Sequence, residues 1–203
     1  MIDQNKRDRP KPYIDRALDM MWKSGKIYNE IILEIGCMRS VLTHHVDITA
    51  YECCNDGHST YLFGRTGSRV ISVDNNPAHI ANAKKACERF GNIIFKEADA
   101  IEHIKKLENC TAYFGLLFLD AWDVDLPDCA EKHLEFYNTI KPVLNDDCLI
   151  LIDDTDLYYD HEKKEFFPDE ECLSGKGKLL IPELIKNGYE IVFNGRQTLL
   201  RKQ

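Results

Sequence analysis

Short, largely apolar runs alternate along the chain with segments in which apolar residues recur every three or four positions. Each of five such runs ends in glycine or aspartate; they cover 31–36, 69–74, 92–99, 113–120 and 148–154. Apolar runs of this length are typical of strands that are buried on both faces of a parallel sheet. Because helical segments separate the runs, the pattern predicts successive strand-helix-strand units with right-handed crossovers.

Boundary residues support the predicted helices. Five are expected: over 13–24, from the segment 56–60 onward, from Pro77 to near Gly91, from Asp99 onward and over 127–140. Pro77 suits the first turn of a helix, where its missing amide hydrogen costs nothing. Asp99 and Glu102 form a start that resembles a capping box.

The end of the chain differs from the rest. Two short strand-like runs, 189–193 and 197–202, are joined around Asn194 and Gly195, which is a strong hairpin signal. The predicted fold class is therefore α/β. We expect a Rossmann-like, doubly wound, mostly parallel seven-stranded sheet that ends in an antiparallel hairpin and carries helices on both faces. A chain of 203 residues suits one such domain, 1–203.

Composition narrows the function mainly by exclusion. The net charge of −8 would repel a phosphate backbone, and the chain has no basic stripe interleaved with aromatic residues, so we expect no nucleic acid partner. No apolar run approaches the ~20 residues of a membrane span, and the first residues do not resemble a secretion signal. The eight cysteines lack CxxC spacing and are expected to be reduced thiols. We therefore expect a cytoplasmic protein without a membrane partner.

Acidic residues end several of the predicted strands, and open parallel sheets bind ligands at that edge. Asp74 could accept hydrogen bonds from both hydroxyls of a ribose, or it could only cap the following helix. Asp99 could meet an adenine amino group, although its capping position explains it equally well. Gly36 would let the backbone approach a ligand closely. These three residues outline a nucleoside site.

The phosphate-binding pattern of dinucleotide enzymes is missing after the first strand. No G-x-G-x-x-G motif follows Gly36, so a dinucleotide cofactor is disfavoured. The next helix opens in the segment 56–60, where backbone amides and the hydroxyls of Ser59 and Thr60 could hold a carboxylate. The methionine part of a cofactor offers such a carboxylate.

The motifs LEIG, GHST, SVDNNP, EAD, FLDAWD and LIDD occur in this order along the chain. Together they resemble the successive motifs of the class I S-adenosylmethionine-dependent methyltransferases, most of all the metal-assisted small-molecule O-methyltransferases of the catechol and macrolide-sugar types. The resemblance implies S-adenosylmethionine as cofactor and a hydroxyl of a small molecule as methyl acceptor. It also implies a set of cofactor-binding residues: Glu34, Gly36, Gly57 and Ser59 at the methionine part, Asp74 at the ribose, Asp99 at the adenine, and His58, Asn75, Ala100 and Asp120 beside them.

Asp120, Asp153 and Asp154 end two strands that should be neighbours, so three carboxylates would meet in one crevice. A hard divalent cation with oxygen ligands would relieve their repulsion. In the O-methyltransferases that the chain resembles, the matching residues hold magnesium (Mg2+), which binds the acceptor and lowers the pKa of its hydroxyl. A metal-free arrangement, in which Asp120 faces the sulfonium of the cofactor, stays open as the alternative.

A general base is harder to assign. The catechol enzymes carry a lysine three residues after the first metal aspartate, and Asp123 stands there in this chain, which argues against a catechol acceptor. We name His161 as a catalytic residue beside Asp120, because His161 lies in the expected acceptor-side loop 154–175 and histidine has a suitable pKa. The other histidines considered are His44, His45 and His58.

Departures from the family pattern keep other interpretations open. Residues 37–56 are an insertion that could form a substrate lid or a packing flap. A nucleotide-dependent oxidoreductase is the rival enzyme, although the sheet of a dehydrogenase normally continues in parallel. A non-catalytic paralogue that only binds S-adenosylmethionine is a third interpretation. The expected partner is a small-molecule acceptor, and the chain could form a homodimer.

Overall fold

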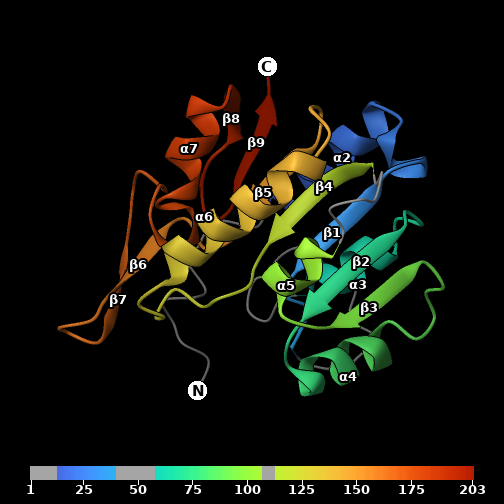
Figure 1. Cartoon of the computed structure of the whole chain (residues 1–203), viewed down its shortest axis with the longest axis horizontal. Coiled ribbons are helices and arrows are strands. Elements are labelled where there is room, and N and C mark those ends of the chain that lie inside the picture. Colours follow the sequence, from blue (N-terminus) through green and yellow to red (C-terminus); the bar gives the residue numbers. More distant parts are fainter. Residues whose placement is uncertain (1–12, 40–57, 107–112) are drawn as a thin grey trace.

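The computed structural model describes residues 13–39, 58–106 and 113–203. Its seven main strands are β1 (Ile31–Ile35), β2 (Val70–Asp74), β3 (Ile93–Glu97), β4 (Phe114–Leu119), β5 (Leu149–Ile152), β8 (Tyr189–Phe193) and β9 (Thr198–Lys202). They form one sheet in the order β3-β2-β1-β4-β5-β9-β8 (Figure 1). The first five strands of this order run parallel, and β9 lies antiparallel to both β5 and β8. The predicted fold class is confirmed.

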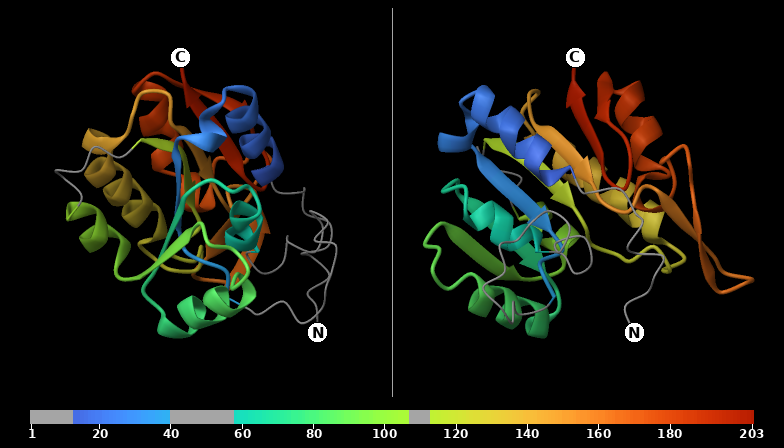
Figure 2. Two further views of the ribbon diagram at one scale, coloured as in Figure 1. Left: turned by 90° about the vertical axis from the view of Figure 1, so that its right-hand side faces the viewer. Right: turned by 180° about the vertical axis from the view of Figure 1, so that it is seen from behind.

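Helices cover both faces of the sheet (Figures 1 and 2). Helices α5 (Ala100–Lys105), α6 (Cys129–Ile140) and α7 (Leu180–Lys186) pack on one face, and α2 (Ile14–Lys23) and α3 (Ser59–Gly64) pack on the other. Side chains of a strand alternate between the faces, so Leu33 and Ile35 join the first layer while Ile32 joins the second. Helix α4 (Pro77–Ala86) contacts β2 and β3.

The burial of the strands explains why their sequences are apolar. All residues of β4 and β5 are buried, because both strands lie inside the sheet with helices above and below. At the sheet edge, β3 is only partly covered and ends in the polar pair Lys96 and Glu97. The continuous apolar pattern is therefore strongest where the sheet is covered on both faces.

Most predicted elements agree with the structure, but one helix is shorter than expected. The helix predicted from Pro77 to near Gly91 ends at Ala86, and Cys87 is its C-cap residue. Phe90 still packs on the ring of Tyr61, with 5.1 Å between centroids, but it does so from a turn. An apolar residue at helical spacing is thus no proof that the helix continues.

Three elements were not predicted, namely two strands and the helix α7. The expected loop 154–175 contains the strands β6 (Leu157–Asp160) and β7 (Glu165–Pro168), which pair as an antiparallel hairpin that projects from the body of the molecule (Figures 1 and 2). A 3-10 turn, η4 (Gly175–Gly177), and α7 follow this hairpin. Two further 3-10 turns of the same length are η1 (Lys26–Tyr28) and η3 (Lys141–Val143). Within the described ranges, no helix is both long and apolar enough to cross a membrane.

Candidate functional site

A cavity of about 210 Å³ lies at the carboxyl edge of the sheet, beyond the ends of β1, β2 and β4. The strand order reverses at β1 and β4, and open α/β sheets bind ligands at such a switch point. We call it the carboxyl-edge cavity. Six of the ten residues predicted to bind the cofactor line it: Gly36, Asp74, Asn75, Asp99, Ala100 and Asp120.

The carboxylate of Asp74 organises the floor of this cavity. Its oxygens accept hydrogen bonds from the backbone amides of Cys37, at 3.1 Å, and Asn76, at 2.8 Å. Nδ1 of His79 lies 3.4 Å from the same carboxylate. The Asp74 side chain is 10% exposed, so it keeps contact with the cavity while it fixes the loop after β1 and the start of α4. The N-cap of α4 is Asn76, whose side-chain oxygen accepts from the amide of Ala78 at 2.9 Å, so the alternative that Asp74 itself caps this helix is wrong.

Asp99 has a capping role and a place in the cavity at once. Its carboxylate accepts a hydrogen bond from the amide of Glu102 at 3.0 Å, and its backbone is extended before α5 begins at Ala100. This contact supplies the expected side-chain half of the capping box. Because Asp99 and Ala100 also line the cavity beside Asn75, the end of β3 contributes to the same site as the end of β2.

Gly36 lets two strand ends approach each other. Its φ is +88°, and a β-carbon on it would lie 2.5 Å from the carbonyl oxygen of Asp120 and 2.8 Å from the amide nitrogen of Ala121. No side chain fits in that space. The residue therefore has to be glycine, both for its backbone conformation and for its close contact with the segment after β4.

Of the residues predicted at the methionine part, Gly36 lines the cavity, whereas Glu34 and Ser59 do not. Glu34 and Ser59 are buried below the cavity lining, where the hydroxyl of Ser59 donates to the Glu34 carboxylate and the hydroxyl of Ser72 donates to it at 2.6 Å. Burial raises the pKa of Glu34 to about 7, although these hydroxyl contacts oppose the shift. His58 precedes α3 and is half-buried, and Gly57 lies outside the described residues. Glu34 thus ties β1 to β2 and α3.

An ion pair crosses the cavity wall. The guanidinium of Arg39 binds the carboxylate of Asp123 through two nitrogens, and both residues line the cavity. Burial alone would raise the pKa of Asp123, but Arg39 outweighs it and lowers that pKa. Asp123 stands where the resembling family has a lysine, so this position holds the opposite charge and has its own partner. The remainder of the insertion, 40–56, lies outside the described residues.

Asp120, Asp153 and Asp154, the aspartate cluster, converge as predicted. One oxygen from each carboxylate lies within 4.8 Å of the others. However, a lysine enters the cluster: the ammonium of Lys176 contacts Asp120 and lies 3.2 Å from Oδ2 of Asp154, while its side chain is fully buried. Arg196 adds a second cation, 3.7 Å from Asp153 and 3.8 Å from Asp154.

The charges of the cluster shift its protonation. Burial, together with the carboxylates of Asp154 and Asp120, raises the pKa of Asp153 to about 7. Gln197 supports Asp153 by donating an amide hydrogen bond of 2.7 Å. Burial alone would lower the pKa of Lys176, but the three carboxylates outweigh burial and raise it, so the ammonium stays charged.

Backbone strain marks the same two strand ends. Trp122, after β4, has a φ of 48°, and Asp154, after β5, has a φ of 49°. Non-glycine residues seldom adopt this region, and such strain concentrates at functional sites. The indole of Trp122 lines the cavity and packs edge-on against the buried ring of His133, at 5.1 Å between centroids. Burial lowers the pKa of His133 to about 3, so its ring is neutral.

His161 is not brought to the cavity. It is exposed beyond the end of β6, and its ring packs edge-on against Tyr159, with 5.0 Å between the centroids. The cavity lining does not include it. The sequence places His161 in the expected acceptor-side loop, but that segment folds into a hairpin that carries the histidine away from the sheet edge.

Sequence analysis missed Lys176, Arg196 and Arg39. The first two come from turns far along the chain, and Lys176 is 56 residues from its partner Asp120. A usable signal was present: Lys176 is a single lysine between Gly175 and Gly177, and glycine often marks a close backbone approach. Nothing in the local pattern shows, however, that such a lysine is buried.

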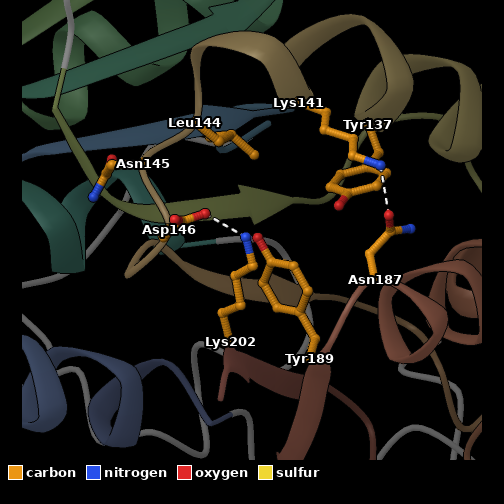
Figure 3. A pocket seen from close by; sticks show the side chains of 8 residues that line it. All are labelled: Tyr137, Lys141, Leu144, Asn145, Asp146, Asn187, Tyr189 and Lys202. Atoms are coloured by element: carbon orange, nitrogen blue, oxygen red, sulfur yellow. Dashed lines mark hydrogen bonds and ion pairs between the residues drawn. The ribbon is translucent and has the colours of Figure 1, made fainter.

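A second pocket lies at the opposite edge of the sheet, where Tyr189 begins β8 and Lys202 ends β9 (Figure 3). Its volume is only about 70 Å³. Its two lysines are already paired, Lys202 with Asp146 and Lys141 with the side-chain oxygen of Asn187, at 2.5 Å. None of the predicted site residues lines this pocket, so it is not the candidate site.

No protein-family profile matches this chain, and neither does any curated protein. Solved structures do match. One is an N-methyltransferase from Bradyrhizobium japonicum, with a TM-score of 0.58, 14% identity and coverage of 100% of this chain and 99% of that one. Another is an O-methyltransferase from Bacillus cereus in complex with SAH (S-adenosylhomocysteine), with a TM-score of 0.55, 14% identity and coverage of 99% and 97%. An SAH-bound methyltransferase from Podospora anserina gives 0.55, 19% identity and coverage of 100% and 82%.

At these identities the likeness establishes the fold alone. The chain has the Rossmann-like fold of these methyltransferases. The match to the two bacterial structures covers nearly the whole length of both chains. A fold hosts many activities, so the activity has to be argued from the site.

Proposed function

We propose that this protein is an S-adenosylmethionine-dependent methyltransferase that moves a methyl group to a hydroxyl of a small molecule. One observation carries the proposal: Gly36, Asp74 and Asp99, each singled out in the sequence for a nucleoside, line a single cavity at the switch point of the sheet. The SAH bound to two proteins of the same fold supports the cofactor.

Each cavity residue then has a role. Asp74 would accept hydrogen bonds from the ribose hydroxyls, Asp99 and Ala100 would border the adenine, and Gly36 leaves room for the ligand beside the backbone. When bound, S-adenosylmethionine supplies a methyl group that its sulfonium has already activated. The chain therefore needs no covalent residue and has to align the acceptor and exclude water.

The acceptor side is proposed from charge. Asp120 lies on the cavity, and Asp153 and Asp154 lie next to it, so the environment disfavours a phosphorylated acceptor and suits a neutral or cationic one. The choice of oxygen over nitrogen rests on the resemblance to O-methyltransferases, because both kinds of enzyme occur among the similar structures.

A divalent cation does not fit the arrangement that the chain adopts. Oxygen ligands for Mg2+ are present in the aspartate cluster, but the ammonium of Lys176 contacts the carboxylates of Asp120 and Asp154. Mg2+ needs near-octahedral oxygen coordination at about 2.1 Å, and its charge would repel the ammonium that already contacts these two carboxylates. We therefore derive no step through a metal.

Two rival functions make different predictions. A nucleotide-dependent oxidoreductase would bind a nicotinamide dinucleotide, which the missing phosphate loop and the reversed strand β9 disfavour. A non-catalytic paralogue would bind S-adenosylmethionine without turnover.

The five described cysteines are free, which supports a cytoplasmic location. We also propose that the protein acts on a small-molecule acceptor, binds neither nucleic acid nor a membrane, and forms a homodimer.

Calorimetric titration tests the proposal. S-adenosylmethionine, SAH and a nicotinamide dinucleotide are titrated into wild type, Asp74→Asn and the exposed control Asp15→Asn. We expect micromolar binding of the first two ligands, weakened at least tenfold in Asp74→Asn because hydrogen bonds to a charged acceptor are lost. Binding of the dinucleotide alone, or of none of the ligands, refutes the proposal. Cofactor binding without methylation of any hydroxylated test compound favours the non-catalytic paralogue.

A further inference from the structure

The aspartate cluster contains its own cations. Among the described residues around the cluster, Lys176 alone has a cationic side chain that is fully buried. Its ammonium contacts both Asp120 and Asp154. Arg196 is 10% exposed and lies within 4 Å of both Asp153 and Asp154. Two cations thus face three carboxylates, and each carboxylate has at least one cationic neighbour.

Lys176 and Arg196 supply the positive charge that a metal ion would otherwise supply to the three carboxylates. Three carboxylates whose oxygens lie within 4.8 Å repel each other unless cations neutralise them. An ion held by Asp120 and Asp154 would occupy the place where the Lys176 ammonium lies, and the two positive charges would repel each other. To bind a metal, the site would have to expel a buried lysine.

The chain is built to place this lysine. Gly175 has a φ of +53°, and a β-carbon on it would lie 2.1 Å from the carbonyl oxygen of Asp154. On the other side, a β-carbon on Gly177 would lie 2.9 Å from a methyl carbon of Thr155. Gly175 lets η4 pack directly on the backbone after β5, and Gly177 leaves room for the side chains of Thr155 and Ile181. In addition, the amide of Ser174 donates to the carbonyl of Thr155 at 3.1 Å. Lys176 can enter the cluster only because its neighbours lack side chains.

We propose that Lys176, assisted by Arg196, is the permanent counterion of the aspartate cluster, so that this site works without a divalent cation. Lys176 is then a positioning residue that holds Asp120 at the cavity. The metal-free part of this inference stands whether or not the protein transfers methyl groups, whereas the role toward Asp120 in catalysis rests on the proposed function.

Titration with Mn2+, followed by the electron paramagnetic resonance of the free ion, tests the inference without any cofactor. Wild type should leave the free-ion signal unchanged at millimolar Mn2+. Lys176→Ala empties the centre of three carboxylates and should bind Mn2+ at least tenfold more tightly than wild type, a change that a merely structural lysine would not produce. The added substitution Asp154→Asn should abolish this gain. Lys178→Ala, an exposed lysine two residues away, is the matched control and should behave as wild type.

Tight Mn2+ binding by wild type that is lost in Asp154→Asn would overturn the inference. So would a folded Lys176→Ala variant with no gain in Mn2+ affinity. If Lys176→Ala fails to fold, the wild-type titration still decides, together with Lys176→Arg, which keeps the charge and should exclude Mn2+ as wild type does. Because SAH binding is measured separately, failure of the proposed function leaves these outcomes intact.

Discussion

The backbone of Gly36 passes so close to Asp120 that a β-carbon at position 36 would lie 2.5 Å from the Asp120 carbonyl oxygen. This contact joins the end of β1 to the end of β4 at the point where the strand order reverses. The amide of Asp120 also donates to the carbonyl of Ile35, at 2.8 Å. The cavity owes its shape to this close approach, and it follows that a small change at residue 36 affects both stability and binding.

Gly36→Ala is expected to destabilise the protein and to abolish cofactor binding. The substitution adds a steric clash to the cost of a positive φ, for which strain of about 1–3 kcal/mol is usual. Gly67→Ala is the matched control, since Gly67 has a φ of +79° but no atom near its missing β-carbon. Urea unfolding should show a larger loss for Gly36→Ala than for Gly67→Ala. Equal losses would mean that the contact with Asp120 is unimportant.

Glu34→Gln is expected to flatten the pH dependence of stability. Burial raises the pKa of Glu34 from 4.5 to about 7. Between these values the native protein keeps a proton that the unfolded chain releases, so the free energy of unfolding is highest below pH 4.5 and falls as the pH rises to about 7. This fall amounts to about 3 kcal/mol at most. Urea unfolding at several pH values measures it. The part caused by Asp153, whose pKa is also raised, remains in the variant.

The ion pair between Arg39 and Asp123 should contribute little to stability. Both side chains are about half exposed, 45% and 51%, and ion pairs at such positions contribute below about 1 kcal/mol. A double-mutant cycle with Arg39→Ala and Asp123→Ala should therefore give a small coupling energy that falls further at high salt. A larger coupling that is insensitive to salt would indicate that the pair is more enclosed than its exposure suggests.

The β6–β7 hairpin lies within the predicted acceptor-side loop 154–175, so we expect its exposed aromatic residues to affect the acceptor and not the cofactor. Tyr158 and Phe166 are 44% and 57% exposed on it, so replacing both with serine should change stability by less than about 0.5 kcal/mol per residue. SAH affinity should stay unchanged, and turnover of an acceptor should fall. Tyr113→Ser, at a residue 65% exposed before β4, is the control. Unchanged turnover in the hairpin variant would remove the hairpin from the acceptor side.

Local pattern was enough for the elements that lie in a repeated environment. Strands β4 and β5 are covered on both faces of the sheet, and their apolar runs predicted them correctly. The turn residues Asn194 and Gly195 predicted the hairpin β8–β9. In contrast, the strands β6 and β7 each carry two adjacent aromatic residues and one charged residue without polar-apolar alternation, which local pattern could not distinguish from a loop.

The site residues also fall into those that the sequence pattern predicts and those that it does not. Asp74 and Asp99 end strands of a parallel sheet, so topology alone brings them together. Glu34 and Ser59 share the motifs of the family, but their hydrogen bond with each other explains them without a ligand. Lys176 reached the aspartate cluster through a turn with no regular spacing from its partners. Contacts of this kind depend on the packing of distant turns, which a single sequence does not encode in any local pattern.

The position of β9 constrains the order in which the chain can fold. Strand β8 is made before β9, yet among the described strands β8 pairs with β9 alone, so β8 cannot join the sheet until β9 has paired with β5. That pairing links residues about 50 positions apart and is slow compared with local contacts. Until it forms, the apolar strand β5 presents an open edge, which is a template for aggregation. Shortened forms that end before Thr198 should therefore accumulate as aggregates during synthesis, even though every helix and every parallel strand is present in them.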